Sequence, residues 1–394
     1  MNRNAARFLP LTLLLAGCAT AIAPAAPPPA PAPPDGERAE TVGPGVRHRF
    51  RVDPTGPWAI HVVEVDLRAC GVELRTLKAG DRLEGRETTL ALARRAEREL
   101  ERPVLAALNA DFFSTAGVPV GAQVVAGEVV REPGSRPVFG LTDREVPFIG
   151  TVELAGELWL SRGVSATLGR VNTPPSGDTL TLYNAFAGDT TPADTGVAEL
   201  VVRRLDAAGD TLRGVLVRMD TLPSGVPVPA DGVVLAARGR AAASVRLLAR
   251  EGDTLRWTLR FHPTPGPVRE MVGGYPVLLR EGREVPDGAT GVRPAFAETR
   301  HPRSAVGWRP DGTLLLVAVD GRQPGYSVGM SLAELRRLFV RLGSVEALNL
   351  DGGGSTALVL RGATVNRPSD AEGERPVANA VLVLGPARGV CRER

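Results

Sequence analysis

The chain has little of several residue types, and each scarcity excludes a class of protein. Of its 394 residues one is lysine, three are cysteine, four are histidine and 4% are aromatic. Arginines therefore carry nearly all the positive charge, and they alternate with acidic residues to a net charge of +3. No extended basic stripe results, so we expect no nucleic-acid partner. The apolar run at residues 8–15 is far shorter than the roughly 20 residues that span a bilayer.

Motifs of several common catalytic sites are also missing. The four histidines are scattered, and neither a His-Glu-x-x-His motif nor paired cysteines are present, which argues against zinc. There is no Gly-x-Ser-x-Gly nucleophile elbow and no Rossmann or Walker glycine pattern. A divalent cation held by carboxylates and carbonyls stays open, although no recognisable loop specifies one.

The first residues are typical of an export signal. Arg3 and Arg7 precede the apolar run, and Leu15-Ala16-Gly17-Cys18 follows it, which resembles a bacterial lipoprotein signal. We therefore expect residues 1–17 to be removed, Cys18 to be lipidated, and residues 18–44 to form an Ala/Pro-rich linker. The predicted product is an exported, membrane-anchored lipoprotein that faces the periplasm or the cell surface. The alternative is an ordinary signal with a chance cysteine.

Two further cysteines remain, Cys70 and Cys391. In an exported protein such a pair can form a disulfide, which here would join an early strand to the end of the chain. The alternative is two free thiols.

The hydrophobic pattern predicts an α+β fold. Alternating residues predict strands within 46–80, and helical spacing predicts amphipathic helices over 88–101 and 331–342. Ser331 and Glu334 have the spacing of a capping box at the start of the second helix. Between residues 150 and 266 short strands alternate with Gly-Asp turns, and no helix is expected there. We therefore expect a mixed β-sheet core built from residues 45–149 and 267–388, two main amphipathic helices, and a β-rich inserted subdomain over 150–266.

Polar side chains stand where apolar strands end. Asn109 and Asp111 follow one strand, and Asn349 and Asp351 follow another. Residues two apart in a strand share a face, so each pair is expected on one side of its strand. We expect these strand ends to converge on one cleft.

Two glycine-containing turns accompany these strand ends. Gly352, Gly353 and Gly354 follow Asp351 directly, and three glycines suit a close approach of a ligand to the backbone or an anion-binding nest. Asp320-Gly321-Arg322 places further polar side chains at a third strand end. An ordinary Asp-Gly turn explains this motif equally well.

These motifs, taken together and in order, resemble the phosphodiester glycosidase family. The resemblance covers roughly residues 45–385. It rests on Asn109-Ala110-Asp111-Phe112-Phe113, Gly273-Gly274-Tyr275-Pro276, His301-Pro302-Arg303-Ser304-Ala305-Val306-Gly307, Asp320-Gly321-Arg322, Asn349-Leu350-Asp351-Gly352-Gly353-Gly354-Ser355-Thr356 and Arg375-Pro376-Val377-Ala378-Asn379-Ala380. It implies a hydrolase that cleaves a sugar-1-phosphodiester, of the N-acetylglucosamine type, or a related glycosidic bond; with the export signal, the expected protein is an envelope lipoprotein hydrolase.

The chemistry of that reaction assigns expected roles. A carboxylate can stabilise an oxocarbenium-like state or activate water, and Asp351 is the first choice, with Asp111 second. His301 suits a proton shuttle, or else is a turn residue before proline. The remaining candidates are expected to bind phosphate, sugar hydroxyls or water: Arg303, Arg322, Asp320, Asn109, Asn349, Asn379, Gly352, Gly353, Gly354 and Ser355. The three asparagines could equally be structural.

A second hypothesis is a non-catalytic glycan-binding envelope lipoprotein that uses the same cleft. The low aromatic content argues mildly against it, because sugar-binding modules usually use aromatic stacking platforms.

Overall fold

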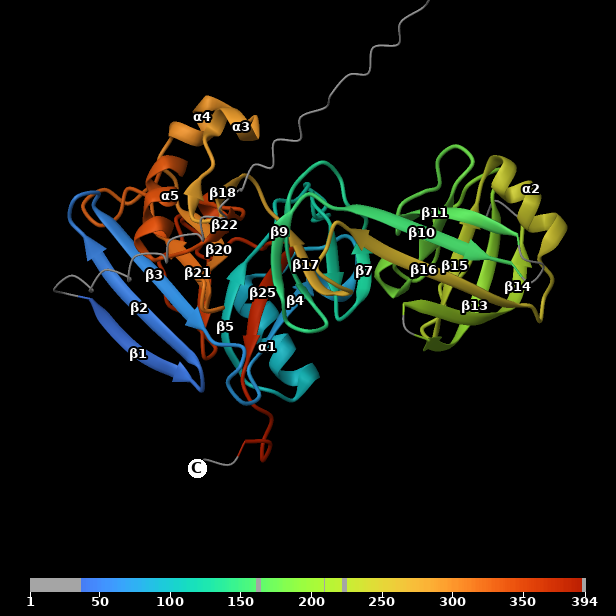
Figure 1. The fold of residues 1–394 in the computed structure, drawn as a ribbon, viewed down its shortest axis with the longest axis horizontal. Helices are drawn as coiled ribbons and strands as arrows, with labels where there is room; N and C mark the ends of the chain where they lie inside the picture. The colour runs from blue at the N-terminus through green and yellow to red at the C-terminus, as the bar shows by residue number, and fades with distance from the viewer. Residues whose placement is uncertain (1–36, 161–163, 209, 222–224, 392–394) are drawn as a thin grey trace, which may run out of the picture.

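A computed structural model describes residues 37–160, 164–208, 210–221 and 225–391. Three β-sheets and a closed β-barrel make up most of the molecule (Figure 1). The barrel lies at one end and the strands near the N-terminus lie at the other. The expected signal at residues 1–17, Cys18 and most of the linker lie outside the described residues. Within the described ranges, no helix is long and apolar enough to cross a membrane.

The largest sheet has eight strands, three from residues 38–65 and five from residues 277–349. The spatial order is β1 (Arg38–Gly43), β2 (Val46–Asp53), β3 (Trp58–Val65), β21 (Leu314–Val319), β20 (Arg303–Trp308), β22 (Glu346–Asn349), β18 (Val277–Arg280) and β19 (Arg283–Glu284). Strand β21 is apolar throughout because both of its faces are covered. Leu316 faces a second sheet, whereas Val317 faces a helix.

That helix is α5 (Leu332–Arg341), and the capping box expected at its start is present. Leu335, Leu338 and Phe339 pack on the sheet as one apolar face. Two short helices, α3 (Asp287–Thr290) and α4 (Pro294–Glu298), follow β19, and α4 contacts α5.

A second sheet packs on the opposite face of the first. Its order is β24 (Ala363–Thr364), β23 (Leu358–Leu360), β5 (Val104–Asn109), β25 (Asn379–Leu384) and β4 (Glu73–Lys78). Leu108 and Val381 meet Val63 of the first sheet in one core. The other face is covered by α1 (Thr89–Leu100), which begins at the N-cap Thr88. The layers are thus helix, sheet, sheet, helix.

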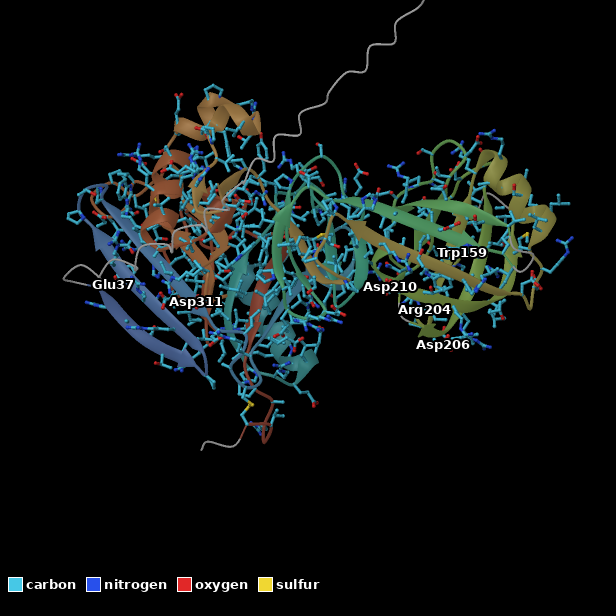
Figure 2. The ribbon with its side chains drawn as sticks, in the orientation of Figure 1. Glu37, Trp159, Arg204, Asp206, Asp210 and Asp311 are labelled. Carbon is cyan, nitrogen blue, oxygen red and sulfur yellow. A yellow bond between two sulfur atoms is a disulfide. The ribbon has the colours of Figure 1, made fainter. Side chains whose placement is uncertain are left out.

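The third sheet joins this core to the barrel. Its order is β7 (Glu128–Arg131), β6 (Gln123–Val125), β17 (Val268–Gly273), β8 (Val138–Thr142) and β9 (Pro147–Gly150). Glu128 accepts two hydrogen bonds from Arg204 of the barrel, at 2.6 and 2.7 Å. Figure 2 labels Arg204 together with Trp159, Asp206 and Asp210, all of which belong to the barrel.

The barrel closes in the order β10 (Glu153–Trp159), β11 (Ser165–Val171), β12 (Leu180–Tyr183), β15 (Gly232–Ala237), β13 (Ala198–Ala208), β14 (Thr211–Asp220) and β16 (Thr254–His262). Trp257 is fully buried in its core. One helix, α2 (Gly239–Leu248), also lies in this stretch, so the expectation of no helix there is wrong. Its buried residues are Ala241, Ala242 and Val245, and such small side chains produce only a weak helical pattern of hydrophobic residues in the sequence.

The prediction of an α+β fold is borne out broadly, because both expected amphipathic helices form on a predominantly β-structure. The expectation of a mixed core sheet is wrong, because every pairing among the described strands of the three sheets is antiparallel. The parallel pair found among the described strands, β11 with β12, belongs to the barrel. Apolar runs reveal burial but carry no information on strand direction, which explains the difference.

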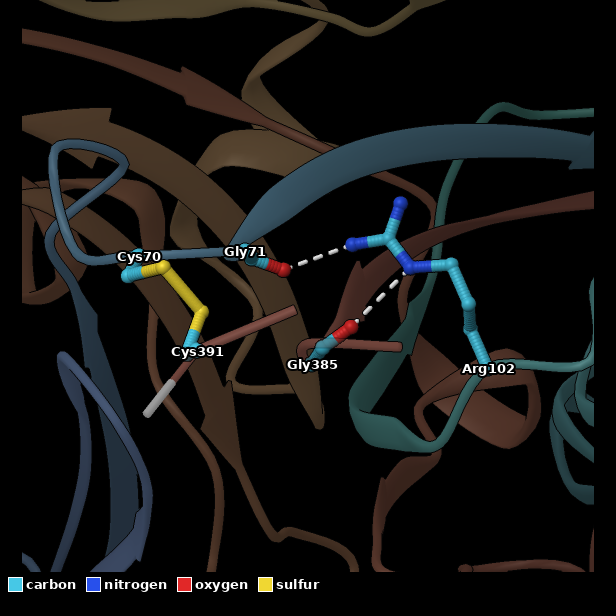
Figure 3. The surroundings of a disulfide bond; sticks show 5 residues. All are labelled: Cys70, Gly71, Arg102, Gly385 and Cys391. Atoms are coloured by element: carbon cyan, nitrogen blue, oxygen red, sulfur yellow. Dashed lines mark hydrogen bonds between the residues drawn. A yellow bond between two sulfur atoms is a disulfide. The ribbon is translucent and has the colours of Figure 1, made fainter. Parts of the chain in front are cut away.

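The two cysteines expected either as a pair or as free thiols form a disulfide. Cys70 and Cys391 have Cα atoms 6.0 Å apart and are separated by 321 residues of chain. Arg102 supports the same junction by donating hydrogen bonds to the carbonyls of Gly71 and Gly385, at 2.6 and 3.0 Å (Figure 3).

Candidate active site

The ends of strands β5 and β22 meet between the two packed sheets. The Asn109 side-chain amide donates to the carbonyl of Asp351 at 2.6 Å, and the Asp351 amide donates to the carbonyl of Ala110 at 2.8 Å. The structure therefore brings the two predicted polar strand ends together. Asp111 and Asp351 are close enough for the charge of one to affect the other.

The side chains of Asn109, Asn349 and Asn379 connect the chain segments around the two aspartates through hydrogen bonds. Asn109 also accepts hydrogen bonds from the Ser304 hydroxyl, at 2.6 Å, and the Ala357 amide, at 3.2 Å. Its amide group therefore connects three segments of the chain. Of the two interpretations of Asn109, a sugar-binding group or a buried structural amide, these contacts favour the second.

Asn379 and Asn349 are placed in the same manner. Asn379 accepts from the Asp111 backbone amide at 2.8 Å and donates to Gln123 at 3.0 Å. Asn349 donates to the carbonyls of Tyr275 and Leu350, each at 2.8 Å. Both side chains thus fix the backbone beside a carboxylate.

Asp111 is a fully buried carboxylate. One of its oxygens accepts from the Gly121 amide at 2.7 Å, and the other has no partner among the described residues. Burial raises the pKa of Asp111 to about 7, and the charge of Asp351 adds to the rise, whereas the Gly121 amide and Arg136 oppose it. Near neutral pH this carboxyl group retains much of its proton.

Asp351 is the more readily ionised member of the pair. Burial raises the pKa of Asp351 to about 6, against the effects of Ser355, the Gly352 amide, Arg375 and Arg136. The Gly352 amide lies 3.0 Å from the carboxylate. Because the environments of the two aspartates differ, one favours the acid form and the other the base form at the same pH.

Glycines make room for these carboxylates. A Cβ atom on Gly273 would lie 2.5 Å from an Asp111 oxygen, and one on Gly121 would lie 2.7 Å from the Gly273 Cα. The Gly273-Gly274-Tyr275-Pro276 motif therefore allows Asp111 to pack directly against the backbone of β17.

The Gly352–Gly354 loop is packed against its neighbours as closely as Gly121 and Gly273 are. A Cβ on Gly352 would lie 2.6 Å from the Pro302 carbonyl, and Gly353 has a φ of +61° with Arg322 against it. Gly354 lies against the ion pair between Arg375 and Asp370. Each glycine is thus required by its surroundings.

The expectation that the Gly352–Gly354 amides form a phosphate-binding nest is wrong for two of these amides. The Gly352 amide already donates to Asp351, and the Gly353 amide donates to the Pro302 carbonyl at 2.9 Å. These two N–H groups are therefore engaged within the protein, which argues against their binding phosphate. The guanidinium groups of Arg322 and Arg375 lie against this loop, and that of Arg375 is paired with Asp370.

Arg303, expected to bind phosphate, is 1% exposed. Its guanidinium donates to the carbonyls of Met330, at 2.8 Å, Thr299, at 3.0 Å, and Phe296, at 3.1 Å. Burial lowers the pKa of Arg303 to about 10. These contacts favour a structural role, because the donors are used on backbone oxygens.

Asp320 is likewise buried and engaged. It accepts hydrogen bonds from the Tyr326 hydroxyl, the Asn366 amide and the backbone of Arg367, at 3.0–3.1 Å. Burial raises the pKa of Asp320. It holds a turn together, which agrees with the alternative that the Asp-Gly pair serves turn chemistry.

Arg322 and His301 remain at the surface of the site. Arg322 is exposed, and its Nη2 lies 3.3 Å from Nδ1 of His301. Burial lowers the pKa of His301, and the charges of Arg303 and Arg322 lower it further. His301 is therefore a neutral imidazole near pH 7, able to accept a proton.

Arg136 is the site residue that sequence analysis missed. Its guanidinium lies 5.2 Å from the ring centroids of both Phe112 and Tyr275, and its charge lowers the pKa of Asp111 and of Asp351. It stands in a loop without a motif, in a chain rich in arginine, so no local pattern distinguishes it. Arg375, by contrast, could have been found in the Arg375–Ala380 motif.

Several buried polar atoms around the two carboxylates lack a hydrogen-bond partner among the described residues. They belong to Asp111, Gln123, Asn349 and Thr356. Because most buried polar atoms in proteins are paired, such a concentration is typical of a functional site. Within the described ranges no group of three or more His, Cys, Asp or Glu side chains is arranged to hold a metal ion.

Parts of the chain are similar to known proteins. The family model described as phosphodiester glycosidase matches residues 207–384, which include Asp351 but not Asp111. The chain is 38% identical over 117 residues to bovine N-acetylglucosamine-1-phosphodiester alpha-N-acetylglucosaminidase, which covers 27% of the chain and 22% of that relative. It is 39% identical over 92 residues to the uncharacterized prophage-derived protein YomE of Bacillus subtilis, covering 23% and 14%.

A solved structure is similar over most of the fold. A hypothetical protein from Synechocystis superposes with a TM-score of 0.68 at 26% identity, covering 86% of this chain and 62% of that one. The matched stretches span less than a quarter of the two curated relatives. The chain is thus similar to the phosphodiester glycosidase family over residues 207–384, and to these relatives over shorter stretches.

Proposed function

We propose that this protein hydrolyses a glycosyl phosphodiester between the anomeric carbon and the phosphate oxygen. The observation that carries the proposal is the buried pair of Asp111 and Asp351, with pKa values of about 7 and about 6, beside Arg136. The bovine relative is named for N-acetylglucosamine-1-phosphodiester, which makes this compound the first substrate to test.

In the proposed reaction Asp351 acts at the anomeric carbon. Its carboxylate takes a proton from water as the water oxygen bonds to that carbon. The carbon–oxygen bond breaks, and its electron pair leaves with the phosphate, producing a free sugar and a phosphomonoester. Phosphate is a good leaving group, so it needs less protonation than an alkoxide; Asp111 supplies a proton where one is required.

Guanidinium groups meet the charge of the leaving phosphate. Arg136 and Arg322 are the candidates, because Arg303 is buried against carbonyls and Arg375 is paired with Asp370. A planar guanidinium matches two phosphate oxygens at once. His301, beside Arg322, is placed to accept a proton at the edge of the site.

The test is turnover of an N-acetylglucosamine-1-phosphodiester by the purified protein and its Asp351→Asn and Asp111→Asn variants. We expect Asp351→Asn to lower kcat by about a hundredfold or more. Asp143→Asn, at an exposed turn, is the matched control. Full activity of Asp351→Asn would refute its role, whereas tight glycan binding without turnover by the unmodified protein would favour a glycan-binding lipoprotein.

We also propose that the protein is exported and anchored to a membrane through Cys18, facing the periplasm or the cell surface. The lipoprotein-like residues 15–18 support this, as does the disulfide between Cys70 and Cys391, since disulfides persist in oxidising compartments. Membrane fractionation of a Cys18→Ala variant tests it: loss from the membrane fraction is expected, and unchanged fractionation would contradict the anchor.

A further inference from the structure

A pocket of about 560 Å³ opens beside the paired carboxylates. Phe112, which directly follows Asp111, forms one wall, and Tyr275 and Phe296 form others. Arg136 also lines the pocket, and its charge affects both Asp111 and Asp351. The pocket therefore lies next to the proposed site of reaction.

Arg136 is held by contacts that leave its donors unused. It is half-buried between the rings of Phe112 and Tyr275, each centroid 5.2 Å from its guanidinium carbon. Among the described residues it makes no hydrogen bond and no ion pair. A guanidinium that is positioned by aromatic rings keeps its N–H groups available for an oxyanion.

A second cation, Arg293, lines the same pocket. Arg293 is exposed and, among the described residues, has no side-chain partner. Ser135 and Thr290 are the other polar side chains in the lining, and no acidic residue contributes to it. The pocket thus combines two cations with no countercharge of its own, an arrangement that favours an anionic ligand.

The alternative occupant, a neutral sugar stacked on the aromatic rings, fits less well. Arg136 covers a face of Phe112 and a face of Tyr275, and Arg303 covers a face of Phe296, 5.1 Å from its centroid. The rings therefore serve to hold guanidinium groups. One face of each ring is thus taken up by a guanidinium group, and the Arg136 guanidinium is the one that lines the pocket.

We propose that this pocket is the leaving-group subsite, in which Arg136 binds the scissile phosphate and Arg293 selects leaving groups with a second anionic group. This inference rests on the proposed hydrolysis. The substrate class is a glycosyl phosphodiester whose alcohol portion itself carries a phosphate or carboxylate. The product that dissociates from the pocket is then a phosphomonoester with an additional negative charge.

Binding of two matched phosphomonoesters to the full-length protein tests the proposal by calorimetry. Glycerol 3-phosphate has a hydroxymethyl group where 3-phosphoglycerate has a carboxylate. We expect 3-phosphoglycerate to bind about tenfold more tightly, since a charge-assisted hydrogen bond contributes on that scale. Arg293→Gln should remove that advantage and leave the affinity for glycerol 3-phosphate within about twofold.

Arg136→Gln should weaken binding of both compounds by about tenfold or more. Arg337→Gln, at an exposed position of α5 outside the pocket, removes the same charge and should change neither affinity. No binding of either compound, no dependence on Arg136 and Arg293, or an equal loss in Arg337→Gln would each overturn the subsite.

The outcome is separable from that of the proposed function. If a glycosyl phosphodiester is hydrolysed and the affinities do not follow Arg136 and Arg293, the subsite is wrong and the hydrolysis stands. If the affinities follow this pattern and no glycosyl phosphodiester is turned over, the hydrolysis is wrong and the pocket remains an anion site.

Discussion

The Asn109 side chain donates a hydrogen bond to the backbone oxygen of Asp351, 242 residues later in the chain, at 2.6 Å. Through this bond the end of β5 is attached to the end of β22. The separation of the two aspartates thus depends on a side chain that need not touch a substrate.

Asn109→Ala is therefore expected to lower activity and stability together. It removes the donor to Asp351 and the acceptor for Ser304 and Ala357, at a cost of about 1–3 kcal/mol of unfolding free energy. Asn172, a buried asparagine bonded to Val130 and Asn184, is a matched position far along the chain. Asn172→Ala should lose stability but keep kcat, and equal kcat losses in both variants would contradict the positioning role.

The pH dependence of kcat/KM should be a narrow bell. Activity should rise as Asp351 loses its proton near its pKa of about 6 and fall as Asp111 loses its proton near its pKa of about 7. Because the two groups interact, the limbs report the pair. Asp111→Asn should remove the alkaline limb. Arg136→Gln should move both limbs upward, because a charge that lowers both pKa values is lost; unchanged limbs would exclude Arg136 from the site.

Burial of Asp111 should also appear in stability. Its pKa is about 7 when folded and near 3.8 when unfolded, so the folded chain binds more protons between these values. The unfolding free energy should accordingly fall as pH rises from about 4 to about 7. Asp111→Asn should be about 4 kcal/mol more stable than the unmodified protein at pH 8, and nearly equally stable at pH 4. Denaturant titration at the two pH values measures this difference.

Arg303 and Arg322 should separate structure from function. Arg303→Gln removes the donors that Arg303 supplies to three carbonyls and should cost about 2–3 kcal/mol of stability. Arg322→Gln removes an exposed charge, so the melting temperature should stay nearly constant while activity on a phosphodiester falls by about tenfold. Thermal unfolding and kinetics of the two variants decide between these assignments, and the reverse pattern would contradict both.

The disulfide should stabilise the junction of the chain's two ends. Cys70→Ser is expected to lower the unfolding free energy by about 2–4 kcal/mol, because the bond closes a very long loop. Arg102 continues to join Gly71 to Gly385, so the variant should still fold. Alkylation without reductant, followed by mass measurement, should find no free thiol on Cys70 or Cys391; two alkylated thiols would refute the bond.

The amphipathic helices and the polar strand ends could be predicted from the sequence because their signals are local. The spacing of apolar residues determined both amphipathic helices, and Ser331 with Glu334 determined where the second one begins. Polar residues after apolar strands marked Asn109, Asp111, Asn349 and Asp351, since a strand end is where a buried run reaches a site. Helix α2 was missed because its buried residues are alanines, whose hydrophobic period is weak.

The rest depended on contacts between distant segments. Arg303 and Arg322 are the same residue type in similar motifs, yet one is buried against carbonyls and the other is exposed beside His301. No local pattern identifies Arg136, which matters because Phe112 and Tyr275, from different parts of the chain, hold it beside two carboxylates. Sequence alone determined which chemical groups stand at the strand ends. Tertiary packing decided which are engaged internally, because burial and partners from other segments of the chain, as far apart as Asn109 and Asp351, set the pKa and the accessibility of each group.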